Sequence, residues 1–376
     1  MAVSRIQIGV IFGATLLWLS LPGIVSQFNG LSSRTLAQSA AIEGSGAKAP
    51  VYPREAPPLR VRPLPGDRQL QETQTLGEDF RVSALQPGYT GSLWVGSWQG
   101  LARINPNTGN ILARIKLPNY TIGALAQDKV GRIWVGTYTG LLRVDPRTNE
   151  TTAQNFSLPS NRVLSLLVDR RGYLWVGTDR GLALISPDQG LLMTTLRNLP
   201  GVSANALSLD PQGQLWVGTL EGLVQINTAN GFILRQQPDV PGTTVQALTL
   251  GPRGTLWAGT PNALLEIDPR TGQVLRSVTQ LRGRNVLSVQ FDKVGSLWVG
   301  TTKGLVRVNP YNGAIAGQIP NLPSDEILAL SPDTGNKVWV GTSEGLGWVS
   351  LTTGEANPHL AFIRQNSESQ NQAQQR

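Results

Sequence analysis

A single five-residue pattern recurs seven times along this chain of 376 residues. It first occurs as Leu93-Trp94-Val95-Gly96-Ser97 and returns in nearly the same form six more times. The interval is 40 residues at the first step and 41 residues at each later step, and the seven tryptophans are Trp94, Trp134, Trp175, Trp216, Trp257, Trp298 and Trp339. So regular a period indicates a repeat architecture rather than one irregular domain.

Each repeat unit contains four short apolar stretches separated by turn residues. In the third unit the expected strands are 163–168, 173–178, 181–185 and 191–196. The turn Asp169-Arg170-Arg171-Gly172 starts with Asp and ends with Gly, which is typical of a type I turn closed by a left-handed glycine. The chain has 42 Gly, 25 Pro and only 15% charged residues, so it is expected to be all-β.

Four antiparallel strands in every unit of about 41 residues predict a seven-bladed β-propeller of four-stranded antiparallel blades. A sheet of this kind has two faces to bury, and only a closed ring gives every sheet a neighbour on both sides. A leucine-rich or β-helical solenoid is the competing architecture, but its units are usually about 20 to 30 residues long. The last unit contains four strands of its own, so we expect the ring to close by whole blades, with segment 59–62 as the alternative closing strand.

The repeated tryptophan is expected to fill the wedge between adjacent blades. A fully buried Trp removes about 150–250 Å² from water, which is worth roughly 4–6 kcal/mol as an upper bound. Glycine follows two residues later, as at Gly96, Gly136 and Gly177, and would let the next blade approach closely. Gln214, beside one of these strands, is expected to lie at the surface.

The chain divides into four parts by composition. Residues 1–40 carry an apolar run after Arg5 and are expected to be a signal peptide, with an uncleaved membrane anchor as the alternative. Residues 41–77 are a Pro-rich linker, residues 78–364 form the propeller, and residues 365–376, rich in Gln, Asn and Ser, are expected to be disordered.

The segment Leu174-Trp175-Val176-Gly177-Thr178, followed by Gly181-Leu182 and repeated over 297–305, resembles the two-component regulator propeller repeat. In that family such propellers often form the exported sensing half of hybrid signalling proteins, followed by a membrane span and a kinase. This chain departs from that arrangement, because residues 365–376 contain neither. The resemblance therefore implies a stand-alone, exported propeller that binds a ligand or a partner.

Composition argues against several kinds of chemistry. The formal net charge of +8 is spread thinly, with no run of Lys or Arg, so nucleic-acid binding is not expected. The absence of Cys removes thiolate metal sites and cysteine nucleophiles. The single histidine, His359, is expected to be a packing or surface residue.

Two enzyme families look similar in their blade pattern. Streptogramin lyases depend on histidine and glutamate around a magnesium ion, and the corresponding histidine is missing here. The segments 268–272 and 105–109 resemble quinoprotein repeats, but neither copy has the tryptophan that follows in those repeats. We therefore expect no cofactor and no metal.

An aspartate begins the first turn of four units: Asp128, Asp169, Asp210 and Asp292. Each is followed by Gly three residues later, so we interpret them as turn caps in preference to calcium ligands.

Candidate binding residues lie in the connections that lead into the first strand of each unit and out of the second. These connections are expected to share the face where the central channel opens. Their aromatic and arginine residues favour a planar or anionic partner group, since Arg pairs with carboxylates and stacks on rings. The candidates are Phe80, Arg81, Trp98, Tyr120, Tyr138, Arg162, Arg180 and Arg284. The alternative is that these residues only cover blade edges.

Two classes of function remain open from the sequence. The first is a non-enzymatic, monomeric, exported propeller that binds a protein partner or small ligand at the channel face. It would touch a membrane only through an uncleaved N-terminal segment. The second is a propeller enzyme of the streptogramin-lyase or quinoprotein kind.

Overall fold

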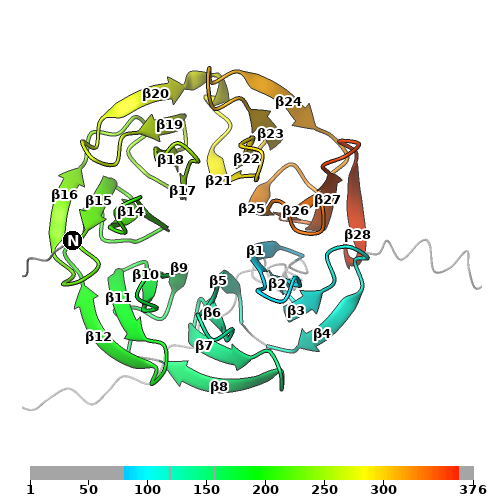
Figure 1. Ribbon diagram of the computed structural model, residues 1–376, viewed down its shortest axis with the longest axis horizontal. Helices are drawn as coiled ribbons and strands as arrows, with labels where there is room; N and C mark the ends of the chain where they lie inside the picture. Colours follow the sequence, from blue (N-terminus) through cyan, green and yellow to red (C-terminus); the bar gives the residue numbers. More distant parts are fainter. Residues whose placement is uncertain (1–79, 118–119, 156, 364–376) are drawn as a thin grey trace, which may run out of the picture. The chain divides into compact units, whose positions relative to one another are not determined.

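The computed structural model describes residues 80–117, 120–155 and 157–363. These residues form seven four-stranded antiparallel sheets arranged in a ring (Figure 1). Within each sheet the strands are hydrogen-bonded in chain order, from the innermost strand at the ring centre to the outermost at its rim. The predicted seven-bladed β-propeller is confirmed.

The first four blades have closely matching strand lengths. Blade 1 comprises β1 (Val82–Pro87), β2 (Leu93–Ser97), β3 (Gly100–Ile104) and β4 (Ile111–Ile115). Blade 2 comprises β5 (Ile122–Gln127), β6 (Ile133–Thr137), β7 (Gly140–Asp145) and β8 (Glu150–Asn155). Blade 3 comprises β9 (Val163–Val168), β10 (Leu174–Thr178), β11 (Gly181–Ser186) and β12 (Leu191–Leu196). Blade 4 comprises β13 (Ala206–Leu209), β14 (Leu215–Thr219), β15 (Gly222–Ile226) and β16 (Ile233–Gln237).

The last three blades repeat the plan. Blade 5 comprises β17 (Ala247–Leu250), β18 (Leu256–Gly259), β19 (Leu264–Ile267) and β20 (Val274–Val278). Blade 6 comprises β21 (Val286–Phe291), β22 (Leu297–Thr301), β23 (Gly304–Val308) and β24 (Ile315–Ile319). Blade 7 comprises β25 (Ile327–Ser331), β26 (Lys337–Thr342), β27 (Gly345–Ser350) and β28 (Ala356–Ile363). Helix within these residues is limited to one 3-10 turn, η1 (Thr279–Leu281), so the described part of the chain contains no membrane-spanning helix.

The ring closes by whole blades, as expected. Blade 7 is built from β25 to β28 in chain order, and its inner strands β25 and β26 pack against β1 of blade 1. The signal-peptide, linker and tail segments, and the alternative closing strand 59–62, lie outside the described residues.

The repeated tryptophans form the core between blades. All seven are at most 3% exposed. The glycine two residues later allows the close approach: a Cβ at Gly136 would lie 2.4 Å from Cγ1 of Val163 in the next blade. At the closing seam a Cβ at Gly341 would lie 2.3 Å from the Val82 carbonyl oxygen. The wedge role assigned from the sequence is confirmed.

The seam between blades 7 and 1 has polar links as well. Lys337 Nζ donates to the carbonyl oxygens of Pro106 and Asn107 at 2.9 and 2.7 Å. Burial lowers the pKa of Lys337. His359 Nε2 lies 2.7 Å from the Gly109 carbonyl oxygen, and its ring packs beside Trp339 and Phe362. His359 is thus a packing residue of the outermost strand, as the sequence predicts.

Candidate functional site

The two sets of connections singled out in the sequence lie together at one end of the blades. In blade 1 the Trp98 N–H donates to the Arg81 carbonyl oxygen at 3.3 Å, and in blade 2 Tyr138 N–H donates to Thr121 at 3.0 Å. Equivalent bonds join Asp179 to Arg162 in blade 3 and Ser343 to Glu326 in blade 7. The two sets therefore form one surface, which we name the loop face; the opposite ends of the blades, where the first and third hairpin turns lie, form the turn face.

A cavity of about 520 Å³ opens at the loop face. We name it the channel-mouth cavity. Connections of blades 1 and 2 line one side of it. The innermost strands of blades 1, 2, 6 and 7 contribute as well, and so does Gln246, which leads into the innermost strand of blade 5. Its lining residues are Arg81, Ser83, Ser97, Trp98, Tyr120, Thr121, Ile122, Tyr138, Gln246, Leu287, Glu326 and Leu328.

Four of the eight candidate residues line this cavity: Arg81, Trp98, Tyr120 and Tyr138. Two more are packed against them. The ring of Phe80 lies 5.1 Å from that of Trp98, centroid to centroid, and the Arg162 guanidinium lies over the Tyr138 ring at 4.7 Å. The aromatic side of the cavity is therefore held by its own ring and cation–π contacts.

Arg180 and Arg284 do not line the channel-mouth cavity. Arg180 is exposed in the connection after β10. Arg284 Nη1 donates to Gln318 Oε1 at 3.1 Å, and Gln318 belongs to the outermost strand β24, so this arginine turns away from the channel. The basic cluster expected from the sequence is therefore smaller than its residue types suggested.

Sequence reasoning missed the polar residues that blades 5 and 7 contribute to the cavity. Glu326 lines the cavity and carries a charge opposite to that of Arg81, so the cavity is not uniformly basic. Gln246 also lines it, and its Oε1 atom is buried without a hydrogen-bond partner among the described residues. A signal was available, because Ser83, Gln246, Leu287 and Leu328 each stand eleven residues before a repeat tryptophan.

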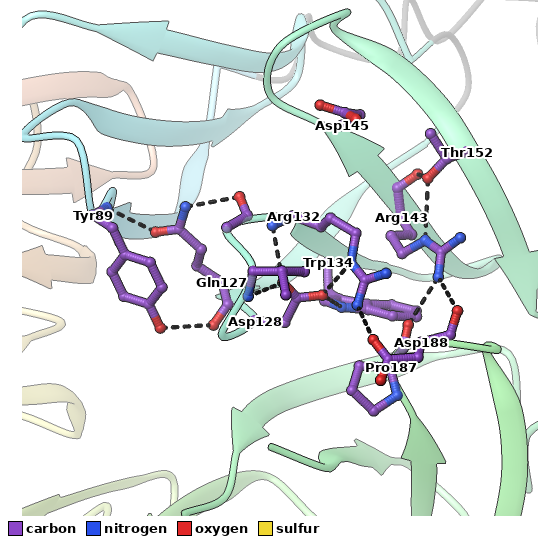
Figure 2. Close-up of polar contacts among 12 residues, drawn as sticks. Tyr89, Gln127, Asp128, Arg132, Trp134, Arg143, Asp145, Thr152, Pro187 and Asp188 are labelled. Carbon is purple, nitrogen blue, oxygen red and sulfur yellow. Dashed lines mark hydrogen bonds and ion pairs between the residues drawn. The ribbon is translucent and has the colours of Figure 1, made fainter.

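The turn face shows how the first-turn aspartates work. In blade 2 Asp128 Oδ1 accepts from the N–H groups of Val130 and Arg132 at 3.1 and 2.9 Å, which confirms the capping interpretation. Its Oδ2 accepts from Trp134 Nε1 at 3.1 Å (Figure 2). The same carboxylate–indole bond occurs at 3.1 Å in blade 3, 3.2 Å in blade 4 and 2.9 Å in blade 6.

The carboxylate of Asp128 also anchors an arginine between blades. Arg132 Nε lies 2.7 Å from Asp128 Oδ2, and its Nη2 lies 2.9 Å from Asp188 Oδ1 of blade 3 (Figure 2). Nearby, Arg143 Nη1 donates to the Pro187 carbonyl oxygen at 2.8 Å. One buried carboxylate thus links a turn, the core indole and the neighbouring blade.

Asp145, at the end of β7, is expected to titrate far below an ordinary aspartate. The hydrogen bond from the Arg147 side chain, 3.0 Å between Nη2 and Oδ2, lowers its pKa from 3.8 to about 2. Since the folded-state pKa is depressed, this pair stabilises the fold above about pH 4 and the contribution is lost as the pH falls through about 2.

A carboxyl-carbon NMR titration should show the pKa of Asp145 rising in Arg147→Gln. It should be unchanged in the control Arg270→Gln, which removes the partner of Asp268. An unshifted Asp145 in the wild type would contradict the assignment.

Within the described residues no group of three His, Cys, Asp or Glu side chains is placed to hold a metal ion. His359 lies on the outermost strand β28, whereas the channel-mouth cavity opens among the innermost strands.

Comparison with known proteins agrees with this architecture. Residues 116–139, 157–180 and 198–221 match the family model described as two component regulator propeller. Each matched segment ends a few residues after a repeat tryptophan: Trp134, Trp175 and Trp216. No curated protein sequence matches the chain.

Solved structures with the same fold fall into two groups. Two extracellular domains of hybrid two-component systems from B. thetaiotaomicron match with TM-scores of 0.62 and 0.60 and identities of 22% and 19%. The matches cover 72% and 74% of this chain but only 38% and 39% of those chains. A catalytically inactive virginiamycin B lyase from Staphylococcus aureus, solved with quinupristin, matches with a TM-score of 0.63 at 16% identity, covering 72% of this chain and 95% of that chain.

At these identities the structural matches establish the fold alone. The chain is a seven-bladed β-propeller, and three of its segments match the model described as two component regulator propeller.

Proposed function

We propose that this protein is an exported, non-enzymatic binding propeller whose channel-mouth cavity recognises a planar polar group of a small ligand or protein segment. The observation that carries the proposal is the cavity itself, which gathers the rings of Trp98, Tyr120 and Tyr138 at the channel opening. Binding sites typically combine an apolar or aromatic wall with a few convergent polar groups.

The polar residues that line the cavity indicate which groups a bound ligand would carry. Gln246 Oε1 is a buried acceptor with no partner among the described residues, so a ligand with a hydrogen-bond donor would satisfy it. Arg81 and Glu326 bring one positive and one negative charge to the lining. A flat group that stacks on the aromatic wall and carries both a donor and an acceptor fits better than a simple anion.

Export and the absence of catalysis are parts of the same proposal. The apolar run near residue 6 and the likeness to extracellular domains of two-component systems support export. The position of the single His359 on an outer strand supports binding over lyase chemistry. Addition of divalent metal ions or a quinone is expected to leave the thermal midpoint unchanged, and a clear rise would favour the enzyme alternative.

The test is comparative co-purification of the mature protein from native envelope material. A ligand of the cavity should be retained by the wild type and lost from both Trp98→Ala and Arg162→Ala. The first variant removes a stacking ring, and the second removes the cation that packs on Tyr138. The matched control is Phe232→Ala, which removes a 70% exposed ring in the turn between β15 and β16, on the turn face. Retention of the same molecules by all variants would overturn the cavity assignment.

A further inference from the structure

Blade 1 lacks the first-turn aspartate that four other blades carry on the turn face. Blade 6 is its nearest counterpart, because both blades have a serine, the repeat tryptophan and an arginine at the same spacing. The blade 6 set is Asp292, Ser296, Trp298 and Arg307, and the blade 1 set is Gly88, Ser92, Trp94 and Arg103. The turns match too: Gly88 N–H bonds to the Ser92 carbonyl oxygen at 2.7 Å and Asp292 N–H to that of Ser296 at 3.0 Å.

The missing carboxylate removes the side-chain acceptor that other blades offer to the indole. Asp292 Oδ2 receives the indole N–H of Trp298 at 2.9 Å, whereas Gly88 at the matching position of blade 1 offers Trp94 no side-chain acceptor. A Cβ at Gly88 would lie 3.4 Å from Trp94 Nε1, so an aspartate here would reach it as it does elsewhere. Only the side chain is lacking.

Arg103 has one unsatisfied donor. Its guanidinium lies over Trp94 at 5.5 Å and its Nη1 donates to the Pro146 carbonyl oxygen at 2.9 Å. Its Nε is buried and has no partner in the described residues. In blade 2 the equivalent Arg143 Nε donates to Thr152 Oγ1 at 3.1 Å, but Leu112 occupies the matching position in β4. No acidic side chain among the described residues forms an ion pair with Arg103.

Trp94 and Arg103 line an open pocket of about 580 Å³ on the turn face between blades 1 and 2. We name it the turn-side pocket. Its walls include Tyr89, Trp94, Arg103, Val130, Pro146 and the ion pair of Asp145 with Arg147. Tyr89 is fixed against blade 2, because its N–H donates to Gln127 Oε1 at 2.9 Å (Figure 2). The pocket therefore combines apolar walls with the Trp94 indole and with Arg103, which forms no ion pair among the described residues, whereas Asp145 in the same wall is already paired with Arg147.

We propose that the turn-side pocket binds a carboxylate that carries an apolar or aromatic group. The carboxylate takes the place that Asp292 fills in blade 6, and accepts hydrogen bonds from Trp94 Nε1 and Arg103. The apolar group rests against Tyr89, Val130 and Pro146. This site is separate from the channel-mouth cavity, which lies at the opposite ends of the strands.

A carboxylate is favoured over other anions because the protein itself shows the fit. Four blades place a planar carboxylate on the indole N–H at 2.9 to 3.2 Å. Arginine with an N–H donor beside it is suited to the two oxygens of such a group. The carboxylate has two sources, a small organic acid or the free C-terminus of a peptide, and both present the same chemistry.

The test uses the full chain with phenylacetate and its neutral amide, phenylacetamide. With ¹⁵N-labelled tryptophan, phenylacetate should shift the indole signal that is missing from Trp94→Phe. Calorimetry should show the amide binding at least about tenfold more weakly than the acid. A second pair, a short peptide ending in Phe with a free or amidated C-terminus, separates the two sources. Equal affinities for acid and amide in both pairs, or no binding at millimolar concentration, would overturn the proposal.

Gly88→Asp is the decisive variant, because it supplies the absent carboxylate from the protein. It should abolish binding of phenylacetate. The new Cβ would lie 2.8 Å from Ser92 Oγ, which can rotate away, and 3.1 Å from the Ser92 carbonyl oxygen; blade 6 has Asp292 and Ser296 at the same spacing. Arg103→Gln should weaken binding by at least about tenfold, and the matched control Arg307→Gln in blade 6 should bind as the wild type does. Unchanged binding in both Gly88→Asp and Arg103→Gln would place the ligand elsewhere.

Discussion

Trp216→Ala is expected to lower the free energy of unfolding by about 3–5 kcal/mol, the usual range for truncating a buried tryptophan. Trp216 is fully buried and belongs to one apolar cluster with Val245 and Leu248 of the next blade. The truncation opens a cavity between two blades. It also removes the indole donor that reaches Asp210 Oδ2 at 3.2 Å. Chemical denaturation followed by circular dichroism measures the loss.

The control for this experiment has to be chosen from the structure. The expectation that Gln214 lies at the surface is wrong: it is half-buried, and its Oε1 is enclosed without a partner among the described residues. Gln212, exposed in the same turn, is the suitable control, and Gln212→Ala should change the free energy of unfolding by less than about 0.5 kcal/mol. Equal losses for Trp216→Ala and Gln212→Ala would contradict the wedge role of the tryptophans.

The fold was predictable because its constraints are local and repeated. The pattern around each tryptophan specifies a strand whose residues are buried on both sides, and the turn glycine before it marks where it begins. Gly172, for example, has φ of 99°, as the left-handed turn position requires. Strands β9 and β12 have the bounds expected from the sequence. Seven equal units of this kind have few ways to bury all their faces other than a ring.

The sites were less predictable because they combine residues from different blades. Gln246 of blade 5 and Glu326 of blade 7 meet Trp98 of blade 1 only once the ring has closed. The direction of a long side chain is also not encoded in its position, as Arg284 shows by bonding to Gln318 on an outer strand. The aromatic side was found because Trp98 and Tyr138 depart from the repeat within neighbouring units.

The sequence places the turn aspartate six residues before the core tryptophan, but only the structure shows that the carboxylate bonds to the indole. Oδ1 caps the turn while Oδ2 reaches the indole, so one carboxylate satisfies donors from two parts of the blade. Gly88 acquires significance only through this comparison, since a glycine at the start of a turn is otherwise unremarkable by itself.

Asp169→Ala is expected to lower the free energy of unfolding by about 2–4 kcal/mol. The Asp169 side chain is 1% exposed. Its Oδ2 accepts from Trp175 Nε1 at 3.1 Å and from Arg171 Nη2 at 2.7 Å, and its Oδ1 caps the turn through the Tyr173 N–H at 3.0 Å. Alanine leaves the indole N–H buried without an acceptor and removes the cap.

Asp169→Asn separates the loss of charge from the loss of the hydrogen-bond acceptor, because its amide oxygen still accepts one hydrogen bond. Its free energy of unfolding should therefore fall between those of the wild type and Asp169→Ala. Asp188 provides the matched control. It also pairs with an arginine, 2.9 Å from Arg132 Nη2, but its side chain is 80% exposed. Exposed pairs contribute at most about 1 kcal/mol, so Asp188→Ala should cost no more than that. If denaturation gave equal losses for Asp169→Ala and Asp188→Ala, the stability would come from the ion pairs alone and the carboxylate–indole bond would have no separate contribution.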